Sequence, residues 1–426
     1  MNYVGTLPEK ILGEAPHTVP TETAHDNSKE VKALEFHGAQ DVRVLYHPKP
    51  IITHEKDCVV RITTTTVCGS DLHLYHRMIP ELKKGYVLGH EGVGIVESVG
   101  PEVKNIKVGQ RVVVSAIMTC GDCWYCKQEL FSCCEATNNS GTMNTLYGHT
   151  SAGILGYSHL LGGYEGTQAE YVRVPYADNN VLPLPATISD EKALSLSDIA
   201  CTSFHGTDLG EVSDKEGRNT VAIWGLGPVG LLAVEWAFVR GAKKVVAIDN
   251  VEARLEIARK LGAVALNFDK EDVYETLMKE FPVTKGPDVG IDCVGFRYNK
   301  SWLHAVQKKL NLETDSIDVV VEVIKSVRKG GVMVLIGDYV GYTNGFPIGA
   351  MMEKGLTTKG GQVHVQKYWK HILQLMLENK FDPSVVYTHT FNFDQMADVY
   401  AKFDAKDGGI IKPIVKTDFA NAAVVA

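Results

Sequence analysis

The sequence lacks two features that would direct it to a membrane or to nucleic acid. No apolar stretch in its 426 residues is long enough and free enough of charge to span a bilayer. Basic residues are not in excess, because the chain has 43 Lys and Arg but 51 Asp and Glu, which gives a net charge of −8. A phosphate backbone or an anionic membrane surface is therefore not expected as a partner.

A recognisable targeting segment is also absent. Residues 1–30 show no basic start followed by an apolar run, and they contain several acidic residues. We therefore expect a cytoplasmic protein whose residues 1–30 form a polar N-terminal extension. Nine cysteines, an odd number in a chain without an export signal, argue against disulfides. Their clustering points to metal instead.

The pattern of apolar, glycine and proline residues changes near residue 200. From about 31 to 185, short β-branched runs between glycines and prolines predict a mostly β unit. After residue 220, expected strands alternate with expected helices, which implies a doubly wound parallel sheet. The expected strands are 220–224, 244–248, 289–293 and 332–336, and the expected helices are 231–240, 252–261, 272–280 and 319–327. A helix over 367–378 and a strand, helix, strand tail should complete the first unit. The polar, basic segment 296–316 is expected to be a surface insertion.

Four cysteines lie within fifteen residues. Thiolates at this spacing can close a tetrahedron around Zn²⁺, which leaves no position for water or substrate and so predicts a structural site. Buried apolar cysteines are the alternative, but the spacers are polar and contain glycine. Cys133 could in principle replace its neighbour in the set, which is Cys120, Cys123, Cys126 and Cys134.

A second group of metal-binding residue types is spread along the chain. A catalytic zinc needs three protein ligands and one open position, and Cys68, His90 and Asp198 could supply the three. Taken alone, each is more often a core hydrogen-bonding residue or a turn residue. Ser70 could accept a proton from a zinc-bound alcohol, and His73 could pass it to water. The alternative for this pair is a Ser-Asp turn with a surface histidine.

A glycine pattern follows the first expected strand of the second unit. Its glycines permit a tight turn and close approach of a pyrophosphate to a helix N-terminus. Nineteen residues after Gly230, Asp249 ends the next strand, where a carboxylate would bond a ribose 2′-hydroxyl and repel a 2′-phosphate. This context favours NAD over NADP, whereas a purely structural turn would leave Asp249 unexplained. The pattern comprises Gly225, Gly227, Pro228, Val229 and Gly230.

Together these residues resemble the zinc-containing medium-chain alcohol dehydrogenase family. Its signature Gly-His-Glu-x₂-Gly-x₅-Gly-x₂-Val runs here from Gly89 to Val103, and the similarity extends from about residue 31 to 417. Within the family the chain looks most like the formaldehyde dehydrogenase and aldehyde dismutase branch. The features that carry this are Leu196-Ser197-Asp198, residues 163–178, the insertion after Gly295, and Gly361-Gln362.

The resemblance implies a fold and a set of roles. The fold is a chaperonin-10-like, mostly β catalytic domain (31–199 and 362–426) with a Rossmann nucleotide domain (200–361). Asp198 becomes the third catalytic ligand, where the wider family usually carries cysteine, although Cys201 lies only three residues on. Ser70 and His73 form the proton relay, and Glu91 is a carboxylate behind the metal. The expected cofactor contacts also include Thr202 near the nicotinamide, Arg254, Gly337, and Lys412 against the pyrophosphate.

These expectations define a zinc-dependent, NAD-linked oxidoreductase acting on a small alcohol or aldehyde, formaldehyde among the candidates. It would contain two Zn²⁺ per chain and form a homodimer or homotetramer. The insertion 296–316 motivates an alternative, a cofactor-retaining aldehyde dismutase. An alternative of another class is a non-catalytic, zinc-stabilised NAD-binding protein. The joint presence of the catalytic-site residue types counts against it.

Overall fold

The computed structural model describes residues 19–295 and 316–420 and divides into two compact units. Of the described residues, we call 202–295 and 316–362 the α/β unit, and 19–201 together with 363–420 the β-rich unit. The divisions were expected after residues 199 and 361, and the structure has them after residues 201 and 362. Except for Ser316, the predicted insertion lies outside the described residues. No helix in the described part of the chain has the length and apolar character that crossing a membrane requires.

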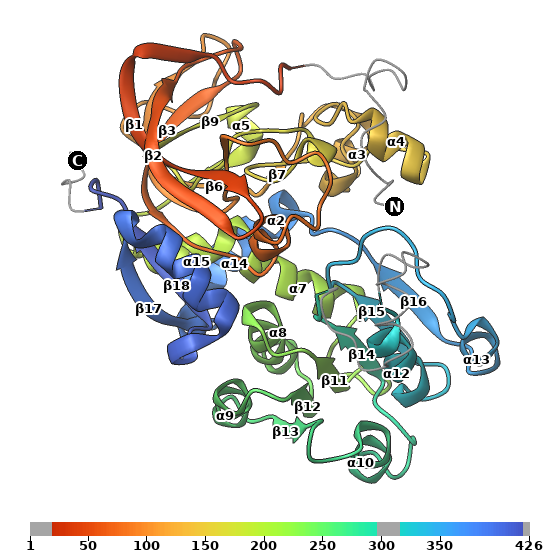
Figure 1. Cartoon of the computed structure of the whole chain (residues 1–426). Coiled ribbons are helices and arrows are strands. Elements are labelled where there is room, and N and C mark those ends of the chain that lie inside the picture. Colours follow the sequence, from red (N-terminus) through yellow and green to blue (C-terminus); the bar gives the residue numbers. More distant parts are fainter. Residues whose placement is uncertain (1–18, 296–315, 421–426) are drawn as a thin grey trace. The chain divides into compact units, whose positions relative to one another are not determined.

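The α/β unit is built on a parallel sheet with the strand order β13-β12-β11-β14-β15-β16 (Figure 1). Its central strands are rich in buried valine and isoleucine, as expected for a sheet covered on both faces. The doubly wound prediction is therefore confirmed. The strands are β11 (Thr220–Trp224), β12 (Lys244–Asp249), β13 (Val264–Asn267), β14 (Val289–Asp292), β15 (Val332–Leu335) and β16 (Thr357–Gly360).

The sequence pattern did not predict β13 and β16. They lie at the two edges of the sheet, and β16 is largely exposed along Thr357–Gly360. An edge strand has only one hydrogen-bonded neighbour and less apolar contact, so it need not carry the buried run by which the other strands were found.

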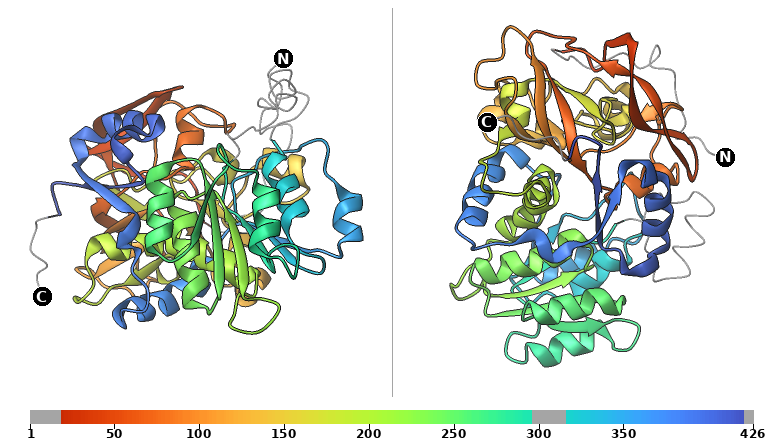
Figure 2. Two further views of the ribbon diagram at one scale, coloured as in Figure 1. Left: turned by 90° about the horizontal axis from the view of Figure 1, so that it is seen from below. Right: turned by 90° about the vertical axis from the view of Figure 1, so that its left-hand side faces the viewer.

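Helices cover both faces of this sheet (Figure 2). The strand order reverses at β11, and right-handed crossovers then place the helices of the two halves on opposite faces. Accordingly α8 contacts α9, and α10 contacts α12. Leu277 of α10 and Val323 of α12 join Ile248 of β12 in one buried cluster. The helices are α8 (Pro228–Val239), α9 (Glu252–Lys260), α10 (Val273–Glu280), α12 (Asp318–Ser326) and α13 (Ile348–Glu353).

The β-rich unit is built mainly of strands, as predicted for this part of the chain, and most of these strands pair antiparallel. A hairpin of β1 and β2 pairs with β4, and a larger sheet has the order β10-β6-β5-β3-β18-β17, with β9 also paired to β3. The strands are β1 (His25–Gly38), β2 (Asp41–Pro50), β3 (Cys58–Thr65), β4 (Tyr86–Val87), β5 (Gly92–Val99), β6 (Arg111–Val114), β7 (Ile117–Met118), β8 (Gly153–Ile154), β9 (Tyr171–Val174) and β10 (Val181–Pro183).

Short helices connect these strands, and the C-terminal segment returns to the same unit. Strand β18 pairs with β3 and with β17, so the tail completes the β-rich unit as expected. The helices are α2 (Asp71–Tyr75), α3 (Trp124–Lys127), α4 (Gly141–Tyr147), α5 (Ala177–Asn180), α6 (Asp190–Leu194) and α7 (Ile199–Leu209), which crosses the unit boundary. The tail comprises α14 (Val365–Leu377), β17 (Tyr387–Asn392), α15 (Met396–Ala405) and β18 (Lys412–Lys416).

The predicted polar extension is shorter than residues 1–30. Val19 is buried, and the guanidinium of Arg173 donates hydrogen bonds to the carbonyls of Pro20 and Glu22 at 2.8 and 3.0 Å. Strand β1 already begins at His25. The sequence predicted a tail here because the side chains of this segment are polar. Its backbone is nevertheless held by Arg173, a buried arginine of β9.

Candidate active site and zinc centres

Three separate segments of the β-rich unit bring Cys68, His90 and Asp198 together. Asp198 Oδ2 lies 4.0 Å from Cys68 Sγ and 3.5 Å from His90 Nε2. One ligand atom from each of these residues, and one from Glu91, fit within 4.8 Å of one another. A thiolate, an imidazole and a carboxylate at this spacing fit a single Zn²⁺. Only the folding of loops near α2, β5 and α7 makes this group.

Cys201, the competing ligand, does not point into the group. Its thiol is fully buried and donates a hydrogen bond to the carbonyl of Leu196 at 3.3 Å. Burial raises the pKa of the Cys201 thiol well above its usual range, which favours the neutral form. Metal binding needs a thiolate, so the geometry favours Asp198 as the third ligand.

Asp71 is a functional residue that the sequence interpretation missed. Its Oδ1 lies 3.1 Å from His90 Nδ1, on the opposite side of the ring from Asp198. Its Oδ2 accepts hydrogen bonds from the backbone of Cys68 at 2.9 Å and from the side chain of Gln168 at 3.2 Å. Such a carboxylate orients a metal-binding histidine and increases its basicity. The available signal was an aspartate between Ser70 and His73, at the start of a helix.

The electrostatics of this group favour a cation. Burial disfavours a charged imidazole, yet the carboxylates of Asp71 and Asp198 raise the pKa of His90 well above its usual value. The buried ring is thus stabilised in its positive form by surrounding negative charge. A divalent ion would supply the same positive charge once His90 is deprotonated.

Glu91 and Lys412 form a buried ion pair beside the cluster. The Lys412 ammonium donates to Glu91 Oε1, and both side chains are at most 1% exposed. Burial would lower the pKa of Lys412, but the negative charge of Cys68 and Glu91 raises it. Lys412 is therefore placed against the predicted carboxylate behind the metal. Its predicted contact with a cofactor pyrophosphate stays a prediction.

Ser70 borders the cluster, and His73 lies one turn further on. The Ser70 hydroxyl is 3.4 Å from His90 Nε2, the ring nitrogen that also faces Asp198. His73 is in helix α2 and only 4% exposed. The alternative of a surface histidine is therefore wrong. The cause is that α2 turns this side chain into the β-rich unit.

The four predicted cysteines also converge. Cys120 Sγ lies 4.0 Å from Cys126 Sγ, and Cys123 Sγ lies 3.9 Å from Cys134 Sγ. The four thiols fit within 4.8 Å of one another. Cys133 is exposed and outside the group, which settles the choice between the two neighbouring cysteines by geometry.

Backbone amides prepare this second cluster for thiolates. The N–H groups of Asp122 and Cys123 point at Cys120 Sγ at 3.4 and 3.3 Å. Hydrogen bonds from Cys126, from Cys134 and from these amides lower the pKa of Cys120. Four soft donors without a carboxylate or histidine among them suit a closed zinc site.

The glycine turn has the predicted form in the α/β unit. It joins β11 to α8, which begins at Pro228. A Cβ on Gly230 would lie 1.8 Å from the carbonyl oxygen of Gly225, so only glycine allows the helix to start this close to the strand. The helix N-terminus that results can receive a phosphate.

Asp249 ends β12 beside this turn. Its Oδ2 accepts a hydrogen bond from Leu226 N–H at 2.7 Å, and its Oδ1 accepts from the amides of Asn250 and Val251. Arg254 of α9 lies 3.5 Å from the same carboxylate. These residues form one polar group at the carboxyl ends of β11 and β12, where open α/β sheets bind their ligands.

Comparisons with known proteins agree with this geometry. The family description "Alcohol dehydrogenase GroES-like domain" matches residues 54–186, and "Zinc-binding dehydrogenase" matches 228–312. A zinc-type alcohol dehydrogenase-like protein of Schizosaccharomyces pombe is 42% identical over 385 residues, which cover 90% of each chain. The chain belongs to the zinc-containing medium-chain alcohol dehydrogenase family.

Other members of this family extend the comparison. The solved structure of the alcohol dehydrogenase TADH from Thermus sp. ATN1 has a TM-score of 0.78 and 31% identity, and the match covers 91% of this chain and 99% of that one. The formaldehyde dismutase of Pseudomonas putida is 31% identical over an alignment of 398 residues, which covers 88% of this chain and 94% of that one. The protein is accordingly a zinc-dependent alcohol dehydrogenase-type oxidoreductase that uses a nicotinamide dinucleotide.

Two further predicted cofactor positions lie in the α/β unit of this family member. Thr202 is in the first turn of α7, four residues after Asp198 in the sequence. A Cβ on Gly337 would lie 2.2 Å from the carbonyl oxygen of Val294, so a glycine is needed where the chain passes close to the segment after β14. Contact of either residue with a cofactor stays a prediction.

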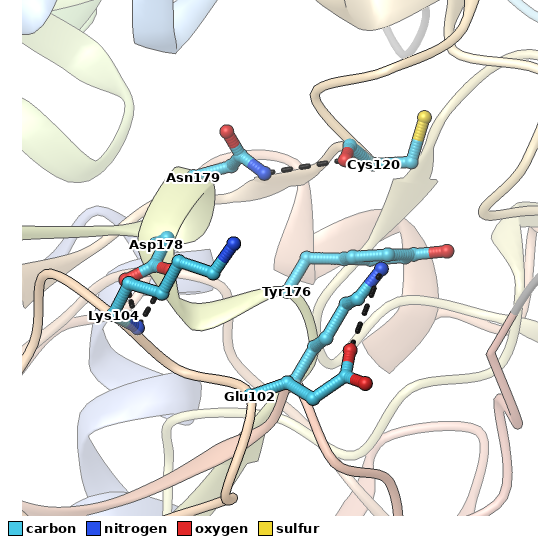
Figure 3. A pocket seen from close by; sticks show the side chains of 7 residues that line it. Glu102, Lys104, Cys120, Tyr176, Asp178 and Asn179 are labelled. Carbon is cyan, nitrogen blue, oxygen red and sulfur yellow. Dashed lines mark hydrogen bonds and ion pairs between the residues drawn. The ribbon is translucent and has the colours of Figure 1, made fainter.

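A pocket in the β-rich unit lies beside the four-cysteine cluster (Figure 3). The Asn179 amide donates to the carbonyl of Cys120 at 3.2 Å, and Lys56 pairs with Glu102 at 3.9 Å. None of its lining residues belongs to the group around His90. The pocket therefore belongs to the surroundings of the cysteine cluster, through Cys120.

Proposed function

We propose that this dehydrogenase transfers hydride reversibly between a small alcohol or aldehyde and NAD. One Zn²⁺ would be held by Cys68, His90 and Asp198, and a second by Cys120, Cys123, Cys126 and Cys134. The observation that carries the proposal is the convergence of a thiolate, an imidazole and a carboxylate beside the Ser70 hydroxyl.

The reaction divides between the bound groups and the chain. When bound, zinc supplies Lewis-acid polarisation of a substrate oxygen, and nicotinamide accepts or returns the hydride. Ser70 accepts the proton of the substrate hydroxyl, because its Oγ lies next to the ring nitrogen of His90 that faces the ligand group. His73, one turn further along α2, would take up that proton and pass it to water. Aldehydes can enter as hydrates, whose second hydroxyl makes oxidation to the acid formally the same transfer.

Surrounding residues hold this arrangement. Asp71 fixes the His90 ring from behind, and Gln168 fixes Asp71 while its own carbonyl accepts a hydrogen bond from the Tyr400 hydroxyl at 2.8 Å. Lys412 compensates the buried charge of Glu91. Donation from His90 Nδ1 toward Asp71 would leave the lone pair of the ring on Nε2, where it could bind the metal.

NAD is proposed over NADP because of Asp249. A carboxylate at the carboxyl end of β12 would accept a hydrogen bond from a ribose 2′-hydroxyl and would repel a 2′-phosphate. Replacing it by serine should shift the kcat/KM ratio toward NADP by about 10-fold or more, since Arg254 would then be available to a phosphate. Steady-state kinetics with both cofactors test this, and an unchanged ratio would contradict it.

Metal analysis and kinetics on one preparation test the main proposal. We expect two zinc ions per chain and NAD-dependent oxidation of a primary alcohol. A non-catalytic, zinc-stabilised protein would keep zinc on the four cysteines but show one ion per chain and no turnover. We also propose a homodimer or homotetramer, the usual assembly of the family, which light scattering would measure.

A second candidate is a cofactor-retaining aldehyde dismutase, favoured by the similarity to the Pseudomonas putida enzyme. The purified protein would be given formaldehyde without added NAD. Equal amounts of formate and methanol would support dismutation. Product formation only after NAD is added would support the dehydrogenase.

A further inference from the structure

A third group of metal-binding side chains lies in the β-rich unit, away from both zinc centres in the sequence. It consists of His25 on β1, His47 on β2 and Glu165 in the loop before β9. Glu165 Oε2 is 3.0 Å from His25 Nε2, and Glu165 Oε1 is 3.4 Å from His47 Nε2. One ligand atom from each side chain fits within 4.8 Å of the others.

A fourth residue orients one of these histidines. Glu35 Oε1 lies 2.9 Å from His47 Nδ1, and its other oxygen lies 3.0 Å from His37 Nε2. Donation from His47 Nδ1 to Glu35 would leave the lone pair of the ring on Nε2. That Nε2 atom is buried and has no hydrogen-bond partner, although it faces Glu165. An unsatisfied ring nitrogen backed by a carboxylate is the arrangement of a metal-bound histidine.

We propose that His25, His47 and Glu165 bind a divalent transition-metal cation, with Zn²⁺ as the metal tested first. Two imidazoles and one carboxylate suit zinc, and water can complete its coordination. The three side chains are 16–23% exposed, so an ion can reach them from solvent. The proposal is independent of the catalytic function, because none of these residues belongs to the group around His90.

The competing explanation is an ion-pair cluster in which protons supply the positive charge. Burial disfavours charge on His47, but the nearby carboxylates of Glu165 and Glu35 raise its pKa. Although burial acts in the other direction, hydrogen bonds from His25 and His47 lower the pKa of Glu165 to about 2. These shifts show only that the cluster stabilises positive charge. Direct metal titration must decide between a proton and a metal ion.

The place of the cluster suggests what an ion would do there. A metal would join the β1–β2 hairpin to the segment that begins at Glu165. Two residues further on, Thr167 N–H donates to the carbonyl of Gly89 at 2.7 Å, and Gln168 holds Asp71. Binding would therefore stabilise the segment that contacts Gly89 and Asp71, and should raise the melting temperature.

Calorimetric titration of the zinc-loaded protein with Zn²⁺ tests the site after a weak chelator has removed loosely bound metal. We expect the wild type to bind one further equivalent and to melt at a higher temperature. His25→Ala/His47→Ala should bind none, and Glu35→Gln should bind about 10- to 100-fold more weakly because it loses the orienting carboxylate. His371→Ala, which removes an exposed histidine on α14, is the matched control and should behave as wild type.

Binding by a variant must be compared only between folded proteins. If the double variant does not fold, His25→Ala alone is used, because His25 is the first residue of β1 and its loss removes one ligand from the edge of the hairpin. The proposal is overturned if the wild type takes up no further equivalent, or if folded His25→Ala binds Zn²⁺ as tightly as His371→Ala.

Discussion

The two proposed zinc centres of the β-rich unit differ in how their ligands are supplied. The cysteine cluster takes four like donors from residues 120–134, and its nearest polar support is backbone N–H groups. The group of Cys68, His90 and Asp198 takes three different donors from distant segments, with Asp71, Glu91 and Lys412 buried around it. The four cysteines would fill the coordination sphere of a metal ion, whereas the group of Cys68, His90 and Asp198 would hold its ion among titratable side chains.

This difference indicates which of the two groups serves stability and which serves catalysis. A short loop of thiolates can fold around its ion with little help, and its donors leave no position for substrate. A mixed set of ligands from distant segments is assembled only when the chain folds, and buried charges around it orient the ligands and adjust their affinity for the metal. Substitutions at the two centres should therefore separate loss of stability from loss of catalysis.

The largest effect is expected at Asp198. Asp198→Ala should lower kcat/KM by about 10⁴-fold, corresponding to roughly 5.5 kcal/mol of transition-state stabilisation, because the zinc loses a ligand. Asp198→Cys is the matched variant, since a thiolate is the ligand usual in the wider family, and it should keep the metal. The comparison would fail if Asp198→Ala retained full activity and zinc content.

Removing one member of the buried ion pair should come next. Lys412→Met should destabilise the protein by about 3–5 kcal/mol, because the Glu91 carboxylate would be left buried without compensation. Glu91→Gln/Lys412→Met should recover most of that stability. Chemical denaturation measures both, and equal destabilisation of the single and double variants would show that the pair is not coupled.

At the cysteine cluster the expected loss is in stability and not in chemistry. Cys123→Ser should release one zinc per chain and lower the unfolding free energy by about 3 kcal/mol, or roughly 6–12 °C in melting temperature. The kcat of the remaining folded protein should stay within about 3-fold of wild type. Cys133→Ser, which changes an exposed cysteine outside the cluster, is the control. If Cys123→Ser kept its zinc but lost most of its kcat, the four-cysteine cluster would not be purely structural, which would contradict the proposal.

Asp71 tests the support of the mixed site. Asp71→Asn should lower zinc affinity or kcat/KM by about 10- to 100-fold, since the amide cannot provide the negative charge behind His90. Zinc content under competition with a chelator and steady-state kinetics would show this. Wild-type values in both measurements would contradict a positioning role.

The smallest effect is a loss of stability in acid near the cysteine cluster. His364 Nδ1 accepts a hydrogen bond from Ser132 N–H at 3.2 Å, and burial together with Lys367 lowers the pKa of His364 to about 4. The unfolded chain therefore takes up this proton first, so the stabilisation is present above about pH 6.5 and is lost as the pH falls toward 4. We expect a loss of roughly 2 kcal/mol after allowing for partial exposure. His364→Gln should flatten the pH profile of the melting temperature in this window, and an unchanged profile would exclude this histidine.

Much of the fold followed from local pattern. The strands β11, β12, β14 and β15 were recognised because a buried parallel strand carries an apolar run, and the glycine turn because only glycine permits its close approach. The edge strands β13 and β16 were missed because they carry less of that run. The folded part of residues 19–30 was missed because Arg173, far away in the sequence, anchors it.

The sequence by itself determined the four-cysteine cluster, since its four thiols are close in the chain and their spacing fits the coordination geometry of one ion. It also provided the identities of Cys68, His90 and Asp198. Only the tertiary structure decided that Cys201 turns away, that Asp71 stands behind His90, and that Lys412 meets Glu91. The reason is physical: these contacts join residues separated by many positions, and burial, which decides their charge, is a property of the folded chain.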